Sequence, residues 1–181
     1  MSFIMRPIRF ASTGFVIAGS GLFDGSSGYL ARTPGSAGTS NKKFTIEVVF
    51  KPKVSGATER LASSGTDSND IFNIQFEDTG QIIIGNEVGG SNNFDLRTTQ
   101  LFRDSSAFAQ LILAVDTSQA TASNRAKVYW NGTRITDFAT DTNPSQNLDG
   151  LICGAHLHQL GFHDGLSLSL DGYMAEAVLI D

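Results

Sequence analysis

The sequence predicts an all-β fold, a two-sheet antiparallel sandwich, and three observations support this. Apolar and polar residues alternate through several short segments, as they do in half-buried strands. Gly, Asn and Asp punctuate these segments, and 19 of the 181 residues are glycine. Charged residues make up only 17% of the chain while Phe occurs 13 times, and no long helical period interrupts the pattern. This length suffices for one sandwich with a substantial core.

The first half of the chain supplies several strands. Large apolar residues take every second position from Phe44 to Phe50, which predicts a half-buried strand, and Pro52 ends it because proline cannot donate to a β-ladder. The alternation returns at residues 71–77. There Phe72, Ile74 and Phe76 form the expected inner face. Shorter strands are expected at residues 60–63, 81–87 and 94–99.

The clearest signal in the chain runs from Phe108 to Asp137. Two alternating segments flank a polar loop, and Asn131-Gly132 then supplies a two-residue turn, because both central positions of a type I′ turn need positive φ. Trp130 shares a strand face with Val128, so we expect Trp130 to point into the core. Strands at 156–161 and 167–180 complete the domain.

Several motifs, in this order, resemble one known family. They are an opening segment with an Asp24-Gly25 turn, the loop Asp116-Thr-Ser-Gln-Ala-Thr-Ala-Ser-Asn-Arg125, the turn Tyr129-Trp-Asn-Gly132 and the closing segment Asp171-Gly-Tyr-Met-Ala-Glu176. Together they resemble the laminin-G-like branch of the concanavalin A-like lectin/glucanase jelly rolls, especially the version found in tailed-phage virion proteins. The resemblance covers residues 20–181 and implies a jelly roll whose last strand returns beside the N-terminal strand.

Residues 1–14 differ from the rest of the chain, and we expect an extended N-terminal arm followed by a jelly-roll domain over residues 15–181. The arm has many large apolar residues and no acidic one, a composition that disordered tails usually avoid. It either binds a partner or covers its own sheet edge. The residues predicted to bind a partner are Phe3, Ile4, Arg6, Ile8, Arg9 and Phe10.

Catalysis is not predicted. Glucanases of this superfamily carry a strand with the pattern Glu-x-Asp-x-x-Glu, where one carboxylate serves as nucleophile and another as acid. Glu47 and Glu176 lack a second carboxylate two residues away. The sequence therefore predicts no catalytic residue and a protein that is not an enzyme.

Two groups of residues suggest metal ligands, although we favour a structural interpretation of both. His156 and His158 share a strand face, and His163 follows, so three imidazoles could hold zinc. The structural alternative is the solvated outer face of an edge strand, with Leu157 pointing inward. Asp67-Ser-Asn-Asp70 offers carboxylates for calcium, but loops of this composition are commonly turns. We therefore predict no metal and no cofactor.

Sugar binding is predicted from exposed aromatic residues, on which a sugar ring can stack. Tyr129 faces away from Trp130 because the two are adjacent on one strand. Tyr29, Tyr129 and Tyr173 are accordingly the candidates for glycan binding. For each of them, ordinary sheet packing with an exposed hydroxyl is the favoured interpretation.

Charge and composition exclude several other classes. The net charge of −5 and the pI near 5.1 argue against nucleic-acid binding, which needs a basic surface. No apolar run approaches the length of a membrane span, and the first residues lack a signal-peptide core. Cys153 is the single cysteine, so we expect no disulfide framework and a small buried side chain.

The functional expectation follows from the resemblance. It implies a non-enzymatic surface protein of a tailed-phage virion, made in the host cytoplasm. Within that class we favour a capsid decoration or cement protein that binds the assembled particle. The alternative is a glycan-binding adhesin or a receptor-binding tail component. Expected partners are other virion proteins, further copies of the chain, with a trimer among the options, and a host-surface glycan.

Overall fold

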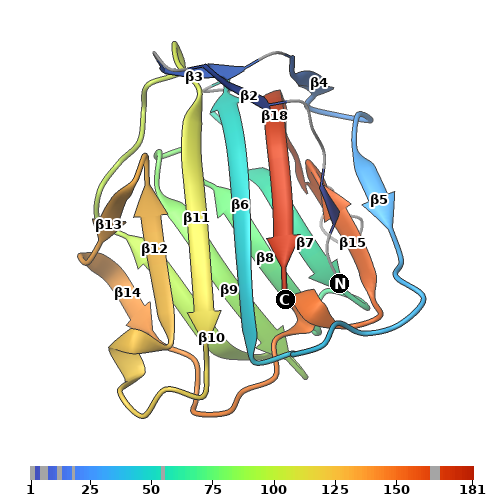
Figure 1. Ribbon diagram of the computed structural model, residues 1–181, viewed down its shortest axis with the longest axis vertical. Helices are drawn as coiled ribbons and strands as arrows, with labels where there is room; N and C mark the ends of the chain where they lie inside the picture. Colours follow the sequence, from blue (N-terminus) through green and yellow to red (C-terminus); the bar gives the residue numbers. More distant parts are fainter. Residues whose placement is uncertain (1–2, 5–7, 12–13, 18, 54–55, 164–167) are drawn as a thin grey trace.

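The computed structural model describes residues 3–4, 8–11, 14–17, 19–53, 56–163 and 168–181. Two seven-stranded sheets face each other, and the described strand pairs are antiparallel. Figure 1 shows one sheet in front of the other. The predicted two-sheet jelly-roll sandwich is therefore confirmed.

The front sheet has the strand order β1-β18-β6-β11-β12-β13, and β4 pairs with the other end of β18. The closing strand thus lies beside strands from the N-terminal region, as the family resemblance implied. The bounds are β1 (Phe3–Ile4), β4 (Gly21–Asp24), β6 (Lys43–Pro52), β11 (Ala109–Asp116), β12 (Ala126–Trp130), β13 (Thr133–Ile135) and β18 (Asp171–Ile180).

The back sheet has the strand order β14-β10-β9-β8-β7-β15-β5. Its bounds are β5 (Leu30–Arg32), β7 (Glu59–Gly65), β8 (Ile71–Phe76), β9 (Ile82–Val88), β10 (Ser91–Thr98), β14 (Phe138–Thr142) and β15 (Leu157–Leu160). The run β7-β8-β9-β10 is a meander, because neighbours in sequence are neighbours in the sheet.

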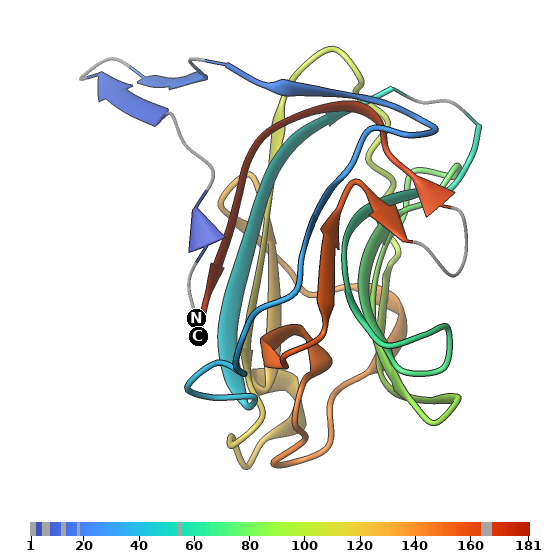
Figure 2. The ribbon, with the colours of Figure 1, turned by 90° about the vertical axis from the view of Figure 1, so that its right-hand side faces the viewer.

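Among the described residues, two hairpins and two short helices lie outside these sheets. The hairpins are β2 (Ile8–Ala11) with β3 (Gly14–Ile17), and β16 (Phe162–His163) with β17 (Leu168–Ser169). Figure 2 shows the β2–β3 hairpin standing out from the upper end of the sandwich. The 3-10 helices are η1 (Ala122–Asn124) and η2 (Leu151–Cys153). The described part of the chain contains no helix with the length and apolar character of a membrane span.

The core lies between the inner faces of the two sheets, and strand β11 shows how alternation builds it. Leu111 and Leu113 are 1% and 0% exposed, whereas Ile112 between them is half-buried on the outer face. Trp130 packs against the core as predicted. Its ring lies 5.9 Å from that of Phe50 and 4.1 Å from that of Phe102, measured between centroids.

Two local predictions are confirmed by backbone geometry and burial. Asn131 and Gly132 have φ values of 49° and 78°, as a type I′ turn requires between β12 and β13. Cys153 is a buried free thiol, and burial raises its pKa to about 11.

The prediction for the histidine-containing strand is wrong. β15 is not an edge strand, because it pairs with both β7 and β5. Leu157 is 37% exposed, whereas His158 is 8% exposed and faces inward. The imidazole is held there by carbonyl groups, since Nδ1 lies 2.9 Å from the His156 oxygen and Nε2 lies 2.5 Å from the Ile152 oxygen. A neutral imidazole carries one N–H, so it donates to one of these two carbonyl oxygens, and that hydrogen bond offsets part of the cost of burying the ring.

Candidate functional site

A polar pocket of about 410 Å³ opens on the outer face of the back sheet, where β7 lies beside β15. Two strands form its floor, and the loop that follows β7 forms one wall. The lining residues are Ser63, Gly65, Thr66, Asp67, Ser68, Leu157, Gln159 and His163.

The floor of the pocket follows from strand register. Gln159 pairs with Ser63, and Leu157 pairs with Gly65. Directly paired residues share a face, so the side chains of Ser63, Gln159 and Leu157 point outward, opposite to His158. Ser63 and Gln159 are nevertheless only 2% and 5% exposed. Polar side chains on the outer face of a sheet are normally solvated, so something must cover them.

The β16–β17 hairpin provides that cover, because it lies against β7. The Ser63 hydroxyl donates to the Phe162 carbonyl over 3.0 Å, and His163 beside it is 6% exposed. Gly161 redirects the chain with a φ of 76°, and a Cβ there would lie 2.2 Å from the Phe23 ring. Only glycine fits this position, so the chain is committed to folding over β7 at this point.

The loop wall is fixed by its own hydrogen bonds. Asp67 Oδ1 accepts from the backbone N–H groups of Asn69 (2.7 Å) and Asp70 (3.1 Å). Asp70 Oδ1 accepts from the Gly89 N–H over 2.8 Å. The suspected calcium loop is thus an Asx turn whose carboxylates bind backbone donors.

The three histidines do not converge on one site. His158 faces the core, whereas His163 lines the pocket on the outer side of the sheet. Among the residues that the structure describes, no group of three His, Cys, Asp or Glu side chains could hold a metal ion.

The chemistry of the pocket suits a ligand rich in hydroxyl groups. Hydroxyl, amide and imidazole groups can each donate or accept a hydrogen bond, and the Asp67 carboxylate accepts. Leu157 adds an exposed apolar contact at the rim. The volume of the pocket lies in the range of small-molecule binding sites. Asp67 is the single carboxylate among the lining residues that the structure describes, whereas glycoside hydrolysis ordinarily needs two.

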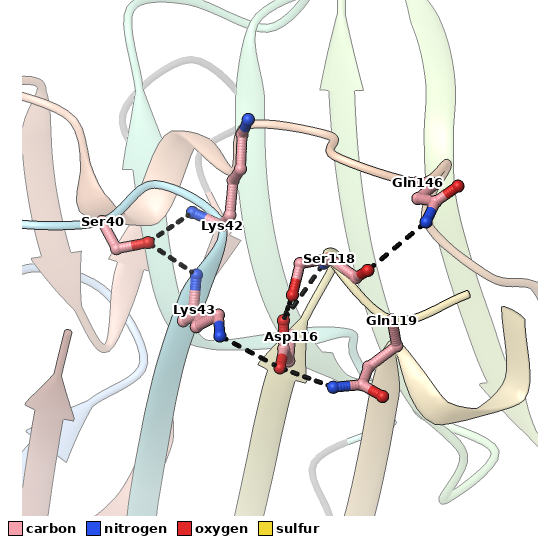
Figure 3. Close-up of polar contacts among 7 residues, drawn as sticks. All are labelled: Ser40, Lys42, Lys43, Asp116, Ser118, Gln119 and Gln146. Carbon is pink, nitrogen blue, oxygen red and sulfur yellow. Dashed lines mark hydrogen bonds and ion pairs between the residues drawn. The ribbon is translucent and has the colours of Figure 1, made fainter. Parts of the chain in front are cut away.

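A second, smaller hollow of about 260 Å³ lies at the far end of β11, and Asp116 lines it together with Gln119, Asn124 and Lys127. Figure 3 shows Lys43, Ser118 and Gln119 converging on the Asp116 carboxylate. Hydrogen bonds from Ser118 and Gln119 lower the pKa of Asp116 to about 2. The Asp116 oxygens therefore accept hydrogen bonds from Ser118 and Gln119 and fix the loop that follows β11.

Arg125 closes the same loop from the other side. Its guanidinium donates to the carbonyls of Gln119 and Ala120, each over 2.8 Å, and to that of Pro144 over 3.0 Å. The motif from Asp116 to Arg125 that carried the family resemblance is therefore a structural clamp at one end of the sandwich.

The candidate tyrosines lie apart. Tyr29 is 46% exposed and stacks on Phe162, with centroids 4.7 Å apart. Tyr173 on β18 is 42% exposed, and Tyr129 on β12 is half-buried. Strands β6 and β11 separate those two, a span of three inter-strand spacings, or about 14 Å. The structure does not gather the three into one site.

The residues predicted to bind a partner also occupy different elements. Phe3 and Ile4 form β1, which pairs with Leu179 and Val178 on β18. Ile8, Arg9 and Phe10 belong to β2, in the projecting hairpin. Arg6 lies outside the described residues. Part of the expected arm thus covers a sheet edge, and part extends away from it.

The pairing of β6 with β18 brings together two carboxylates that sequence reasoning kept apart. Glu47 pairs with Val178 and Glu176 pairs with Val49, so the two glutamates lie diagonally on one outer face. Glu47 accepts a 2.6 Å hydrogen bond from Gln110, and Glu176 is 9% exposed. A search for two carboxylates on one strand could not reveal this pair.

The comparison with family models matches residues 24–179 to a family described as the concanavalin A-like lectin/glucanases superfamily, of the laminin G type. No curated protein sequence matches the chain.

Several solved structures share the fold. A CBM40 domain of the Ruminococcus gnavus IT-sialidase, bound to α2,3-sialyllactose, has a TM-score of 0.64 and 15% identity, with 88% of each chain covered. A heptameric SAP-like pentraxin from Limulus polyphemus has a TM-score of 0.59 and 16% identity over 87% of this chain and 73% of its own. Domains LG4-5 of the mouse laminin α1 chain have a TM-score of 0.58 and 12% identity, covering 95% and 44%. At these identities the likeness concerns the fold alone.

Proposed function

Because the chain belongs to the concanavalin A-like lectin/glucanase superfamily, we propose that it is a non-catalytic glycan-binding module. The observation that supports this most is the pocket beside β7 and β15. Its floor presents Ser63, Gln159 and His163, polar side chains that are each at least nine-tenths buried and yet line an open hollow.

Such an arrangement favours recognition over simple stability. A pocket lined by several polar side chains buries little apolar surface, so it contributes little packing energy to the fold. The strands and the Asx turn fix these groups before a ligand arrives, which lowers the entropic cost of binding. Sugar hydroxyls can bond to the amide and imidazole, while Leu157 contacts the apolar side of a ring.

Sialylated glycans are the first ligands to test, since the CBM40 structure of similar fold holds sialyllactose. Binding is measured by calorimetry with 3′-sialyllactose and lactose, after a screen of a broader glycan panel. We expect Gln159→Ala to weaken binding of the selected glycan at least tenfold. Gln146→Ala, in the other polar loop region, is the matched control and should bind like the parent.

The melting temperature of both variants shows whether either has lost its fold. Parent-like affinity of a folded Gln159→Ala variant would contradict the site. Loss of binding on changing Gln119 or Lys127 instead would move the site to the hollow at Asp116.

The absence of catalysis is tested separately on the diagonal pair Glu47 and Glu176. The parent is incubated with β-glucans and with sialyllactose. We expect no release of reducing ends or free sialic acid. Release that disappears in Glu176→Gln would make the protein a glycosidase.

A second proposal concerns where the module acts: on the surface of a tailed-phage virion, as a capsid decoration protein or as a receptor-binding tail component. What supports it is the resemblance of the loop after Asp116 to virion proteins, together with the hairpin that stands out from the sandwich (Figure 2). Imaging labelled protein on intact particles tests this proposal. Deletion of residues 1–13 should leave a folded domain that no longer co-sediments with shells lacking the native copy.

A further inference from the structure

Asp67 gives the polar pocket beside β7 and β15 a negative charge. Of the Asp, Glu, Lys and Arg residues that the structure describes, it alone lines this pocket. The residue is exposed, on the loop that follows β7, so a ligand can reach it. The two strands of the floor lie side by side in Figure 1. A ligand that enters the pocket therefore meets one carboxylate.

The two oxygens of this carboxylate have different roles. Oδ1 accepts from the backbone N–H groups of Asn69 and Asp70 and so holds the Asx turn. Oδ2 accepts no hydrogen bond from the part of the chain that the structure describes. The turn thus fixes the carboxylate and leaves one anionic oxygen for a ligand. Such an oxygen prefers a charged donor, because charge-assisted hydrogen bonds are roughly twice as strong as neutral ones.

No accessible Lys or Arg balances this charge on the described strands around the pocket. Strands β5, β7, β15 and β16 and the loop at 66–70 contain two such residues, Arg32 and Arg60. Arg32 pairs with His158, so it lies on the inner face of the sheet and points away from the pocket. Arg60 is 1% exposed and does not line the pocket. A carboxylate on a ligand would therefore meet neither a guanidinium nor an ammonium group.

The charge of the rest of the molecule acts in the same direction. The whole chain carries a net charge of −5, which repels anionic ligands at long range. His163 is the other titratable group of the described lining, and an unperturbed imidazole is mostly neutral at about pH 7. Near neutral pH the pocket is therefore suited to a cationic ligand.

We propose that Asp67 sets the sugar specificity of this pocket. A sugar with an ammonium group binds best, a neutral sugar binds less tightly, and a sugar with a carboxylate is disfavoured. The inference rests on the proposed glycan-binding function and deepens it by naming the class of sugar. The ammonium donates to Asp67 Oδ2, while sugar hydroxyls bond to the Gln159 amide and the His163 imidazole. The effect is modest in size, because Asp67 is exposed and water screens its charge.

Three trisaccharides with the same β-1,4-linked glucose backbone test the ranking, since they differ only at C2. They are chitotriose with an ammonium, cellotriose with a hydroxyl and triacetylchitotriose with an acetamide. Calorimetry with the full chain is done at about pH 7, where an α-amino type of group is mostly protonated. We expect chitotriose to bind about three to ten times more tightly than either of the others. Lactose should bind more tightly than 3′-sialyllactose.

Asp67→Asn isolates the charge, because an Asn side chain keeps an Oδ1 acceptor for the N–H groups of Asn69 and Asp70. This variant should melt like the parent, bind cellotriose like the parent and lose the preference for chitotriose. Asp104→Asn is the matched control. Asp104 is also exposed, its Oδ1 accepts from the Ser106 N–H over 2.8 Å, and it lies outside the pocket lining. The control variant should keep the preference of the parent.

The outcomes separate this inference from the function on which it rests. If no glycan of the panel binds, the proposed function fails and the specificity fails with it. If glycans bind but chitotriose has no advantage, or if Asp67→Asn keeps that advantage, the inference is overturned while the glycan-binding function stands. Tighter binding of sialyllactose than of lactose overturns it too, as does trilysine that binds as tightly as chitotriose. An advantage that falls with added salt and disappears in Asp67→Asn supports the inference.

Discussion

Strands β11 and β7 are each paired on both sides, one in the front sheet and one in the back sheet, yet they use their outer faces differently. β11 alternates regularly, and its outer residues Gln110, Ile112 and Ala114 are half-buried. β7 is buried along nearly its whole length, including the polar Arg60 and Ser63. The difference is the β16–β17 hairpin, which adds a second layer over β7. The β16–β17 hairpin thus converts part of the outer face of the back sheet into a partly covered polar pocket.

The largest predicted effect tests the alternation of β11. Leu113→Ala should lower the free energy of unfolding by about 2–5 kcal/mol, because it removes a fully buried side chain from a packed core. Ile112→Ala, one residue away on the outer face, should cost less than about 1 kcal/mol. Urea denaturation of both variants measures this. Equal losses would contradict the assignment of faces.

His158→Ala probes the inner side of the site-bearing sheet. The change leaves the Ile152 and His156 carbonyl oxygens without the imidazole, at an expected cost of about 2–3 kcal/mol. Urea denaturation again gives the value. An unchanged free energy of unfolding would mean that water replaces the imidazole ring easily, and that the position of the short helix η2 does not depend on His158.

Arg60→Met tests a buried polar residue of β7, and here the expected change is a gain in stability. Arg60 is 1% exposed, its Nε and Nη1 atoms are buried without a hydrogen-bond partner, and burial lowers its pKa to about 10. Removing an unsatisfied buried charge should stabilise the domain by about 1–3 kcal/mol. A destabilised variant would show that the guanidinium is satisfied, for instance by buried water. Thermal unfolding at fixed pH is the measurement.

A smaller effect is expected at the end of β11, where the Asp116 pKa is lowered to about 2. Because this pKa is below the ordinary value of 3.8, ionised Asp116 stabilises the fold above about pH 4, and that contribution disappears as the pH falls toward 2. Melting temperatures of the parent and Asp116→Asn should therefore differ at pH 7 and converge near pH 2. A difference that persists at pH 2 would point to lost hydrogen bonds alone.

The smallest effect is expected at Cys153 in η2, which packs in the core on the inner side of the back sheet. Its buried thiol, with a pKa raised to about 11, should react with a disulfide reagent far more slowly in the native protein than in urea. Absorbance of the released thiolate follows the reaction. Fast labelling of the folded protein would mean that η2 opens often.

The local sequence pattern was enough to predict most strands and the residues on their core-facing side. Alternation placed Phe72, Ile74 and Phe76 in the core, and the Asn131-Gly132 pair identified the type I′ turn, because both depend on residues close in sequence. It failed for β15, since a strand's inner face is ambiguous when a buried histidine can bond to carbonyl groups. The role of Asp67 as a turn residue was one of the two interpretations that its composition allowed.

What the sequence by itself determined was the fold class, the positions of most strands and the packing of Trp130 against the core, since these follow from periodicity and turn chemistry. Tertiary structure alone decided which polar residues meet. Ser63, Gln159 and His163 come from separate strands and line one pocket only because β15 is inserted between β7 and β5 and the chain then folds back at Gly161. Contacts between segments far apart in sequence leave no local signal, so the polar pocket beside β7 and β15 could be found only in three dimensions.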